Sequence, residues 1–215
     1  MKRFVLLSAA ALLAWQAIAF AEGSAAPGDR TDGPAVLPFT FFTTHYELLG
    51  DQSNPTGVRY SNDGAPFADT PNGRRRIAIS GAGAWDPAAE AATGGGTYEI
   101  TNREGRVVSD GTWTALRFKS FLQLPGWWAI DGFVEEGWQG PPGSVSFSGF
   151  LELRIELDDG RRGLLTAWCI MPTTPHHGGH ISDGVSLTGE ELNFTDTTAT
   201  EMSFEGMMFY GPEGP

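Results

Sequence analysis

The segment that decides the fold is SVSFSGFLELRIEL, residues 144–157. Apolar side chains or glycine occupy the odd positions from Val145 to Leu157, and mainly polar side chains occupy the even positions. Because side chains on a β-strand alternate between the two faces of a sheet, this pattern predicts a long strand with one buried face. Phe150 is the exception, an aromatic residue among the polar positions.

Working outward from this strand, alternation and turn residues predict a series of further strands. Residues 158–163 carry turn chemistry, and Leu164–Met171 is apolar on both faces, as in a central or covered strand. Other strands are predicted at Phe39–Leu48, Arg76–Trp85, Thr97–Thr101, Arg106–Phe121 with a bulge or second turn at Asp110–Gly111, Val185–Thr188, Leu192–Thr195 and Thr200–Phe209. Gly94–Gly96 leads into Thr97–Thr101, and residues 86–92 allow two helical turns at most.

The fold class that follows is all-β, with about eight strands at meander-like spacing in one domain. No segment of ten or more residues carries an apolar stripe of helical period. Mid-strand glycines help a sheet to curl and close, so a single antiparallel β-barrel is favoured over a two-sheet β-sandwich, which is the alternative.

The two ends of the chain have different compositions from the middle. Residues 1–21 predict a secretory signal, because Lys2 and Arg3 precede an apolar run and Ala19–Ala21 is a small-x-small cleavage signature. We therefore expect a secreted or periplasmic protein cleaved near Ala21, with a flexible leader at 22–35, the barrel at 36–210 and a frayed tail at 211–215. No later run approaches roughly 18 apolar residues, so no membrane anchor is expected in the mature form.

Charge and cysteine content limit the classes of partner. The chain carries a formal net charge of −12, and cleavage after Ala21 would leave 12 basic against 26 acidic side chains, or −14. Such a surface repels phosphate backbones, so nucleic acid is not an expected partner. The basic clusters Arg74–Arg76 and Arg161–Arg162 follow turns, and solvated strand ends are favoured there over anion sites. The single cysteine, Cys169, predicts a buried side chain and excludes an intramolecular disulfide.

One stretch resembles a known group of proteins. The glycine-punctuated hairpin from Gly94 through Thr101 to Gly111-Thr112-Trp113, preceded by Gly81-x-Gly83, resembles the meanders of secreted small β-barrels of the allene oxide cyclase and dirigent group. The resemblance covers about a third of the chain and matches none of that group's catalytic positions. It implies a barrel and ligand binding in the lumen.

Three of the four histidines suggest a metal site. His176, His177 and His180 lie in a segment rich in proline and glycine, and Asp183 follows it. Imidazole nitrogens bind Zn or Cu well, and Asp183 could complete the ligand set. No H-E-x-x-H or C-x-x-C framework accompanies them. A solvated loop that holds no cofactor is therefore the favoured interpretation, and the metal site is the alternative.

Residues 125–138 bring three indoles and three carboxylates together. Indole faces stack on sugars and other flat ligands, and carboxylates accept hydroxyl hydrogen bonds. The candidate ligand contacts are Trp127, Trp128, Asp131, Glu135 and Trp138. An apolar plug over one end of the barrel, which packing alone would explain, is the favoured interpretation of these residues; ligand contact and glycosidase chemistry are the alternatives.

These observations lead to three functional hypotheses. The first is a non-enzymatic exported barrel that binds a small apolar or saccharide-like ligand at one end. The second is a metal-dependent hydrolase or lyase built on the histidine segment. The third is a structural or cell-surface module without a small-molecule site. An enzyme is not favoured, because the sequence contains no G-x-S-x-G elbow and no phosphate loop.

Overall fold

The structure is a computed structural model that describes residues 39–51, 54–61, 64–124, 134–137, 144–170, 182–195 and 205–212. Its strands are β1 (Phe39–Asp51), β2 (Asn54–Ser61), β3 (Phe67–Asp69), β4 (Arg75–Asp86), β5 (Ala91–Asn102), β6 (Val107–Leu124), β7 (Val134–Glu136), β8 (Ser144–Leu157), β9 (Arg162–Ile170), β10 (Ser182–Gly189), β11 (Asn193–Phe194) and β12 (Glu205–Pro212). The secondary structure of these residues is all β. A helix able to cross a membrane does not occur in the described part of the chain.

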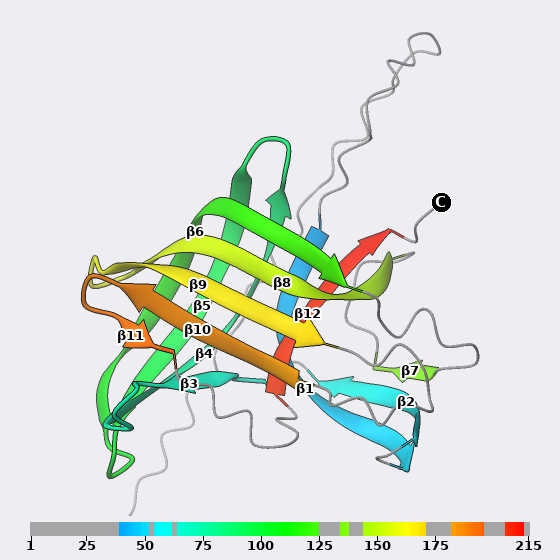
Figure 1. The fold of residues 1–215 in the computed structure, drawn as a ribbon, viewed down its shortest axis with the longest axis horizontal. Helices are drawn as coiled ribbons and strands as arrows, with labels where there is room; N and C mark the ends of the chain where they lie inside the picture. Colours follow the sequence, from blue (N-terminus) through cyan, green and yellow to red (C-terminus); the bar gives the residue numbers. More distant parts are fainter. Residues whose placement is uncertain are drawn as a thin grey trace, which may run out of the picture. The chain divides into compact units, whose positions relative to one another are not determined.

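Eight of the strands form a nearly closed barrel (Figure 1). They are antiparallel neighbours in the order β10, β9, β8, β6, β5, β4, β1 and β12. The sheet curls back on itself because β12 also pairs with the start of β8, from Phe209 opposite Phe147 to Pro212 opposite Ser144. The predicted antiparallel barrel is thus confirmed, and the alternative of a two-sheet sandwich is wrong.

Four short or peripheral strands extend this barrel. β11 pairs with β10, β3 pairs with β4, and β2 pairs with β1, all in antiparallel fashion. β7 pairs with β2 in parallel, with Gly57 opposite Val134 and Arg59 opposite Glu136. β12 runs through Gly211 and Pro212, two residues that we expected to lie in a frayed tail.

The interior of the barrel follows from the alternation in β8. Its odd residues from Phe147 to Leu157 are buried, and Leu153 and Ile155 are fully buried. An aromatic cluster fills the space between β4, β6 and β12, where Trp85 packs with ring-centroid distances of 5.0 Å to Phe121 and 5.8 Å to Phe209. Burial of such large apolar surfaces is the main stabilising term for a chain without a disulfide.

Glycines let β4 and β5 approach each other closely. Gly81 and Gly96 are cross-strand partners, and a Cβ atom on Gly96 would overlap the Ser80 carbonyl. The Trp113 indole of β6 lies against Gly81, and its Nε1 donates a hydrogen bond of 2.9 Å to the Ser80 carbonyl. The run Gly94–Gly96 therefore lies inside a strand, because only residues without a side chain fit at this contact.

The register shifts lie elsewhere than we expected. Asp110–Gly111 continues β6 without interruption, so the predicted bulge at this point is wrong. Shifts occur instead at Ile100/Thr101 opposite the start of β6, and at Ala115/Arg117 and Phe118/Ser120 between β6 and β8. Such irregularities bend a long strand, as curling of the sheet requires.

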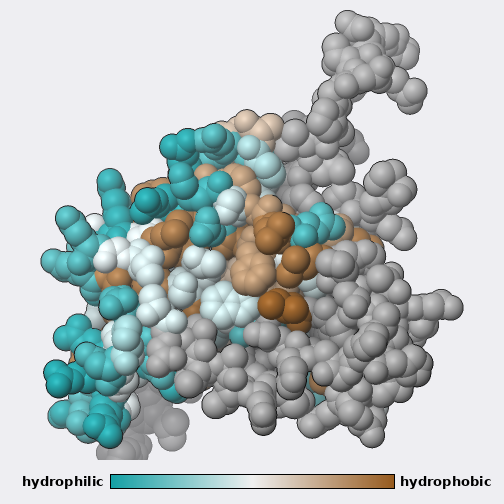
Figure 2. Space-filling view, viewed as in Figure 1, coloured by the Kyte–Doolittle hydropathy of each residue, from teal (hydrophilic) through white to brown (hydrophobic). Residues whose placement is uncertain are grey.

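An apolar row on the outer face explains the exception at Phe150. Leu122 of β6, Phe150 of β8 and Trp168 of β9 are cross-strand neighbours. The Phe150 and Trp168 rings stack with centroids 6.3 Å apart, and a side chain at Gly184 of β10 would overlap the Trp168 indole. Figure 2 shows apolar atoms gathered over these strands. Phe150 departs from the polar pattern because it packs against an outer neighbour.

Candidate functional site

Two turns lie at one edge of the sheet, where β4 begins and β5 ends. The first joins β3 to β4 and contains Asn72, whose Oδ1 accepts a hydrogen bond of 3.0 Å from the Arg74 amide. The second joins β5 to β6, where the Asn102 Oδ1 accepts hydrogen bonds of 3.1 Å and 2.9 Å from the amides of Glu104 and Arg106. Such bonds from an asparagine side chain to nearby amides stabilise tight turns.

The register of the sheet places these turns side by side. Arg75 is opposite Asn102, and Arg76 is opposite Thr101. Gly73 and Gly105 have positive φ values of 62° and 73°, a conformation that glycine adopts at low cost. A Cβ atom on either glycine would meet no other atom within 4 Å, so the space above both turns is open.

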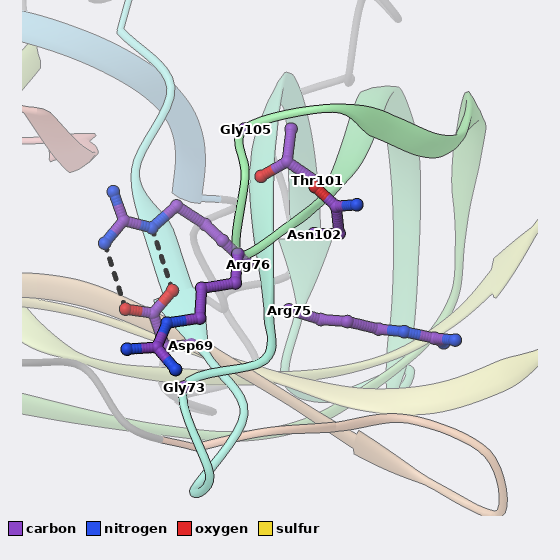
Figure 3. A pocket seen from close by; sticks show the side chains of 8 residues that line it. Asp69, Gly73, Arg75, Arg76, Thr101, Asn102 and Gly105 are labelled. Carbon is purple, nitrogen blue, oxygen red and sulfur yellow. Dashed lines mark hydrogen bonds and ion pairs between the residues drawn. The ribbon is translucent and has the colours of Figure 1, made fainter.

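A pocket of about 260 Å³ lies between the two turns (Figure 3). Its charged lining residues are Asp69, Arg75, Arg76 and Arg103, and its polar ones are Thr101 and Asn102. The side-chain Oδ1 of Asn102 already accepts hydrogen bonds within the turn, whereas its side-chain NH2 group and the guanidinium groups of the arginines are donors. The lining is therefore rich in donors and in positive charge.

The cations of the pocket differ in their partners. Arg76 forms a bidentate ion pair with Asp69, with Nε to Oδ1 at 2.8 Å and Nη2 to Oδ2 at 2.9 Å, and its Cζ lies 3.9 Å from the centroid of the Phe67 ring. The hydrogen bond that Arg76 donates to the Asp69 carboxylate raises the pKa of Arg76 above its ordinary value. Figure 3 shows Arg75 extending away from the Asp69–Arg76 pair.

Arg75 and Arg103 have no carboxylate partner among the described residues. Several other described arginines are ion-paired, for example Arg59 with Glu47 and Glu136. In a chain of net charge −12, exposed cations without a counter-charge at the edge of a pocket create a local positive field. The arrangement can attract and hydrogen-bond an anion.

A second polar cluster lies at the turn between β8 and β9. The Tyr98 hydroxyl contacts the Asp158 Oδ1 at 3.3 Å and the Asp159 Oδ2 at 3.4 Å, and the Asp158 Oδ2 accepts a hydrogen bond of 2.9 Å from the Thr112 amide. The Arg161 Nε donates a hydrogen bond of 2.7 Å to Asp159. The members of this cluster are bonded to one another, which fixes the turn against β5 and β6.

Most of the predicted ligand site lies outside the described residues. This applies to Trp127, Trp128, Asp131 and Trp138. Glu135 lies in β7, where its backbone is opposite Val58 of β2. The neighbouring Glu136 forms an ion pair with Arg59, at 2.8 Å from Nη2. The ligand-binding role of the indole segment stays a prediction.

The predicted metal site is described only at Asp183, since His176, His177 and His180 lie outside the described residues. Asp183 is 4% exposed, and its Oδ1 accepts a hydrogen bond of 3.3 Å from the Ile170 amide. Among the described residues, no group of three or more histidine, cysteine or acidic side chains is placed so that it could hold a metal ion. Cys169, the cross-strand partner of Asp183, is buried with its Sγ 3.7 Å from the Met208 Sδ, so the prediction of a buried cysteine is confirmed.

Only some of the residues that line the arginine pocket could be identified from the sequence. The sequence shows the cluster Arg74–Arg76, and its pattern favours solvated strand ends over an anion site. Arg103 was not identified, because its proximity to Arg75 depends on the β4–β5 register. An asparagine followed closely by glycine in each turn, at Asn72 and Asn102, was the available sign that two turns flank this edge.

Comparison of the chain with protein-family models, with curated proteins and with solved structures gave no match. The resemblance to the allene oxide cyclase and dirigent group therefore stays a prediction. The fold and the pocket define a β-barrel with an arginine-lined cleft at one end of its sheet.

Proposed function

We propose that the protein is a non-enzymatic, exported binding protein that takes up a small anionic ligand in the arginine pocket. The proposal retains the barrel with a small ligand that we inferred from the sequence. It adds the arginine pocket as a candidate site beside the indole segment, and it specifies that the ligand is negatively charged. The observation that carries it is the pocket between the two turns, lined by Arg75 and Arg103 without a described carboxylate partner.

The chemistry of the lining supports an acidic ligand. Guanidinium groups bind carboxylate and sulfate or phosphate oxygens with two parallel hydrogen bonds. Thr101 and Asn102 add a hydroxyl and an amide that can bond to further oxygens of the same ligand. An acidic saccharide or a small organic acid meets these requirements, and so the saccharide-like ligand inferred from the sequence is compatible with this pocket.

Isothermal titration calorimetry at low ionic strength tests the proposal, with glutarate and sulfate as probes. We expect at least one of them to bind with a dissociation constant below about 1 mM. Raising the salt concentration should weaken binding, because exposed charges are screened. Absence of binding for both probes up to roughly ten times that concentration would contradict the proposal.

Single-residue variants assign the binding to the pocket. Arg103→Gln should weaken binding about fivefold, close to 1 kcal/mol, which is the upper range for an exposed ion pair. Arg75→Gln should have a smaller effect, because its side chain extends away from the pair that forms one wall. Arg154→Gln is the matched control, since Arg154 is exposed on β8 and has no ion pair among the described residues. Equal losses in all three variants would rule out this pocket.

A further inference from the structure

The charged residues of the pocket define the charge of a matching ligand. Arg75, Arg76 and Arg103 contribute three positive charges, and Asp69 contributes one negative charge, so the lining carries a net charge of +2. A ligand with charge −2 neutralises it, whereas a third negative charge would have no partner in the lining. Like charges brought together without a partner are costly, and this is how proteins reject near-matches.

Asp69 is the residue that lowers this charge from +3 to +2. Its carboxylate holds Arg76 through two hydrogen bonds of 2.8 Å and 2.9 Å, while the Phe67 ring supports the guanidinium plane from one side. Arg76 is therefore already bound to a carboxylate that belongs to the protein. The pair is partly accessible, because 47% of the Arg76 side chain and 20% of the Asp69 side chain are exposed. An anion bound in the pocket would therefore interact electrostatically with both members of the pair.

The size of the pocket restricts the ligand further. Its volume of about 260 Å³ lies below the range of roughly 300–1,000 Å³ that is typical of pockets for drug-sized ligands. Glycine at both turns keeps the entrance open, and the two asparagine-stabilised turns hold the walls in place. The ligand that fits is compact, with its charges close together.

From these observations we infer that the pocket selects a compact dianion, and that Asp69 is the specificity-determining residue because it neutralises Arg76. The inference rests on the proposed function, since it names the ligand class of the same site. A dicarboxylate and a tetrahedral dianion such as sulfate share this chemistry. Asp69 acts through Arg76 and the charge of the pocket.

A series of carboxylates tests the selection by charge. Butyrate, glutarate and tricarballylate carry one, two and three carboxylates, and sulfate is a dianion without a carboxylate. For the unmodified protein, calorimetry should show glutarate binding at least about fivefold more tightly than butyrate, and tricarballylate no more tightly than glutarate. Sulfate binding that equals glutarate binding identifies charge as the selected property, and much weaker sulfate binding identifies the dicarboxylate as the ligand class.

The variant Asp69→Asn tests the role of the carboxylate with little change of shape. We expect the ratio of tricarballylate to glutarate affinity to rise roughly threefold, because the lining then carries a charge of +3. Glu99→Gln removes one negative charge from an exposed position of β5 outside the pocket lining, and this control should leave the ratio unchanged.

The outcomes separate this inference from the proposed function. If glutarate binds but shows no advantage over butyrate, or if Asp69→Asn leaves the ratio unchanged, the selection of a dianion is wrong and anion binding stands. If the unmodified protein binds none of the four probes, the proposed function fails and the inference fails with it. A rise of the ratio in Glu99→Gln equal to that in Asp69→Asn would also overturn the inference, because net charge alone would then explain it.

Discussion

The substitution Gly111→Ala should destabilise the barrel through one contact. A Cβ atom on Gly111 would overlap the Asp158 carboxylate, which accepts the Thr112 amide at 2.9 Å and the Tyr98 hydroxyl at 3.3 Å. The φ of Gly111 is not positive, so alanine fits the backbone at this position. The carboxylate must therefore move, and its hydrogen bonds lengthen or break.

The size of the effect follows from the bonds that are lost. A hydrogen bond to a charged group contributes about 1.5–3 kcal/mol, and the Thr112 bond is the shortest of those that Asp158 accepts. We expect Gly111→Ala to lower the free energy of unfolding by about 2 kcal/mol, which corresponds to a fall in Tm of roughly 4–8 °C for a protein of this size. Urea unfolding followed by fluorescence measures it, since Trp85 and Trp113 are buried.

A double-mutant cycle identifies the cause. Asp158→Ala removes the carboxylate and makes room for a methyl group at residue 111. In that background Gly111→Ala should cost less than about 0.5 kcal/mol, so that the two changes are strongly non-additive. If the alanine costs the same with and without Asp158, the contact does not explain the requirement for glycine.

Three further predictions concern the core, the charged turn and the cysteine. Leu153→Ala should cost about 2–5 kcal/mol in the free energy of unfolding, because the side chain is fully buried in the barrel; a cost below 1 kcal/mol in urea titration would contradict this placement. The hydrogen bond from Arg161 lowers the pKa of Asp159, so this pair stabilises the fold above the unfolded value of about 3.9, and that stability is lost as the pH falls through the lower folded pKa. Asp159→Asn should therefore lose less stability than the unmodified protein between pH 7 and about pH 2, and equal losses in urea titrations would refute the linkage. Cys169 is a buried free thiol, so differential scanning calorimetry should give the same Tm with and without a reducing agent, whereas a lower Tm on reduction would reveal a disulfide between two chains.

The barrel could be predicted because its longest signal depends on local alternation. In β8, Leu151, Leu153 and Ile155 are buried as the period of two requires. β2 and β3 were missed, since Pro55, Gly57 and the short segment Phe67–Asp69 carry little alternation. Each is a strand because it pairs with a neighbour along the chain, β2 with β1 and β3 with β4, and the residues of β2 and β3 do not reveal that pairing by themselves.

The glycine run shows where local reasoning stops. Gly94–Gly96 lies within β5, although such runs usually mark turns. The reason is the cross-strand contact with Gly81 and the Trp113 indole, which comes from a third strand. The arginine pocket also depends on contacts between strands. Arg76 and Arg103 are recognisable as cations in the sequence, but their proximity depends on the β4–β5 register, which the sequence pattern does not determine.

The pairing of β1 with β12 has a consequence for how the molecule is made. Thr40 is opposite Tyr210, so the first described strand, β1, pairs with the last one, β12. Contacts between residues so far apart in the chain make folding slow. During synthesis the backbone groups of β1 that pair with β12 have no partner until β12 has been made. Unpaired strand edges of this kind promote association with other chains. The order of synthesis thus leaves this edge of β1 unpaired until β12 has been made, which is the period when association with another copy competes with closure of the barrel.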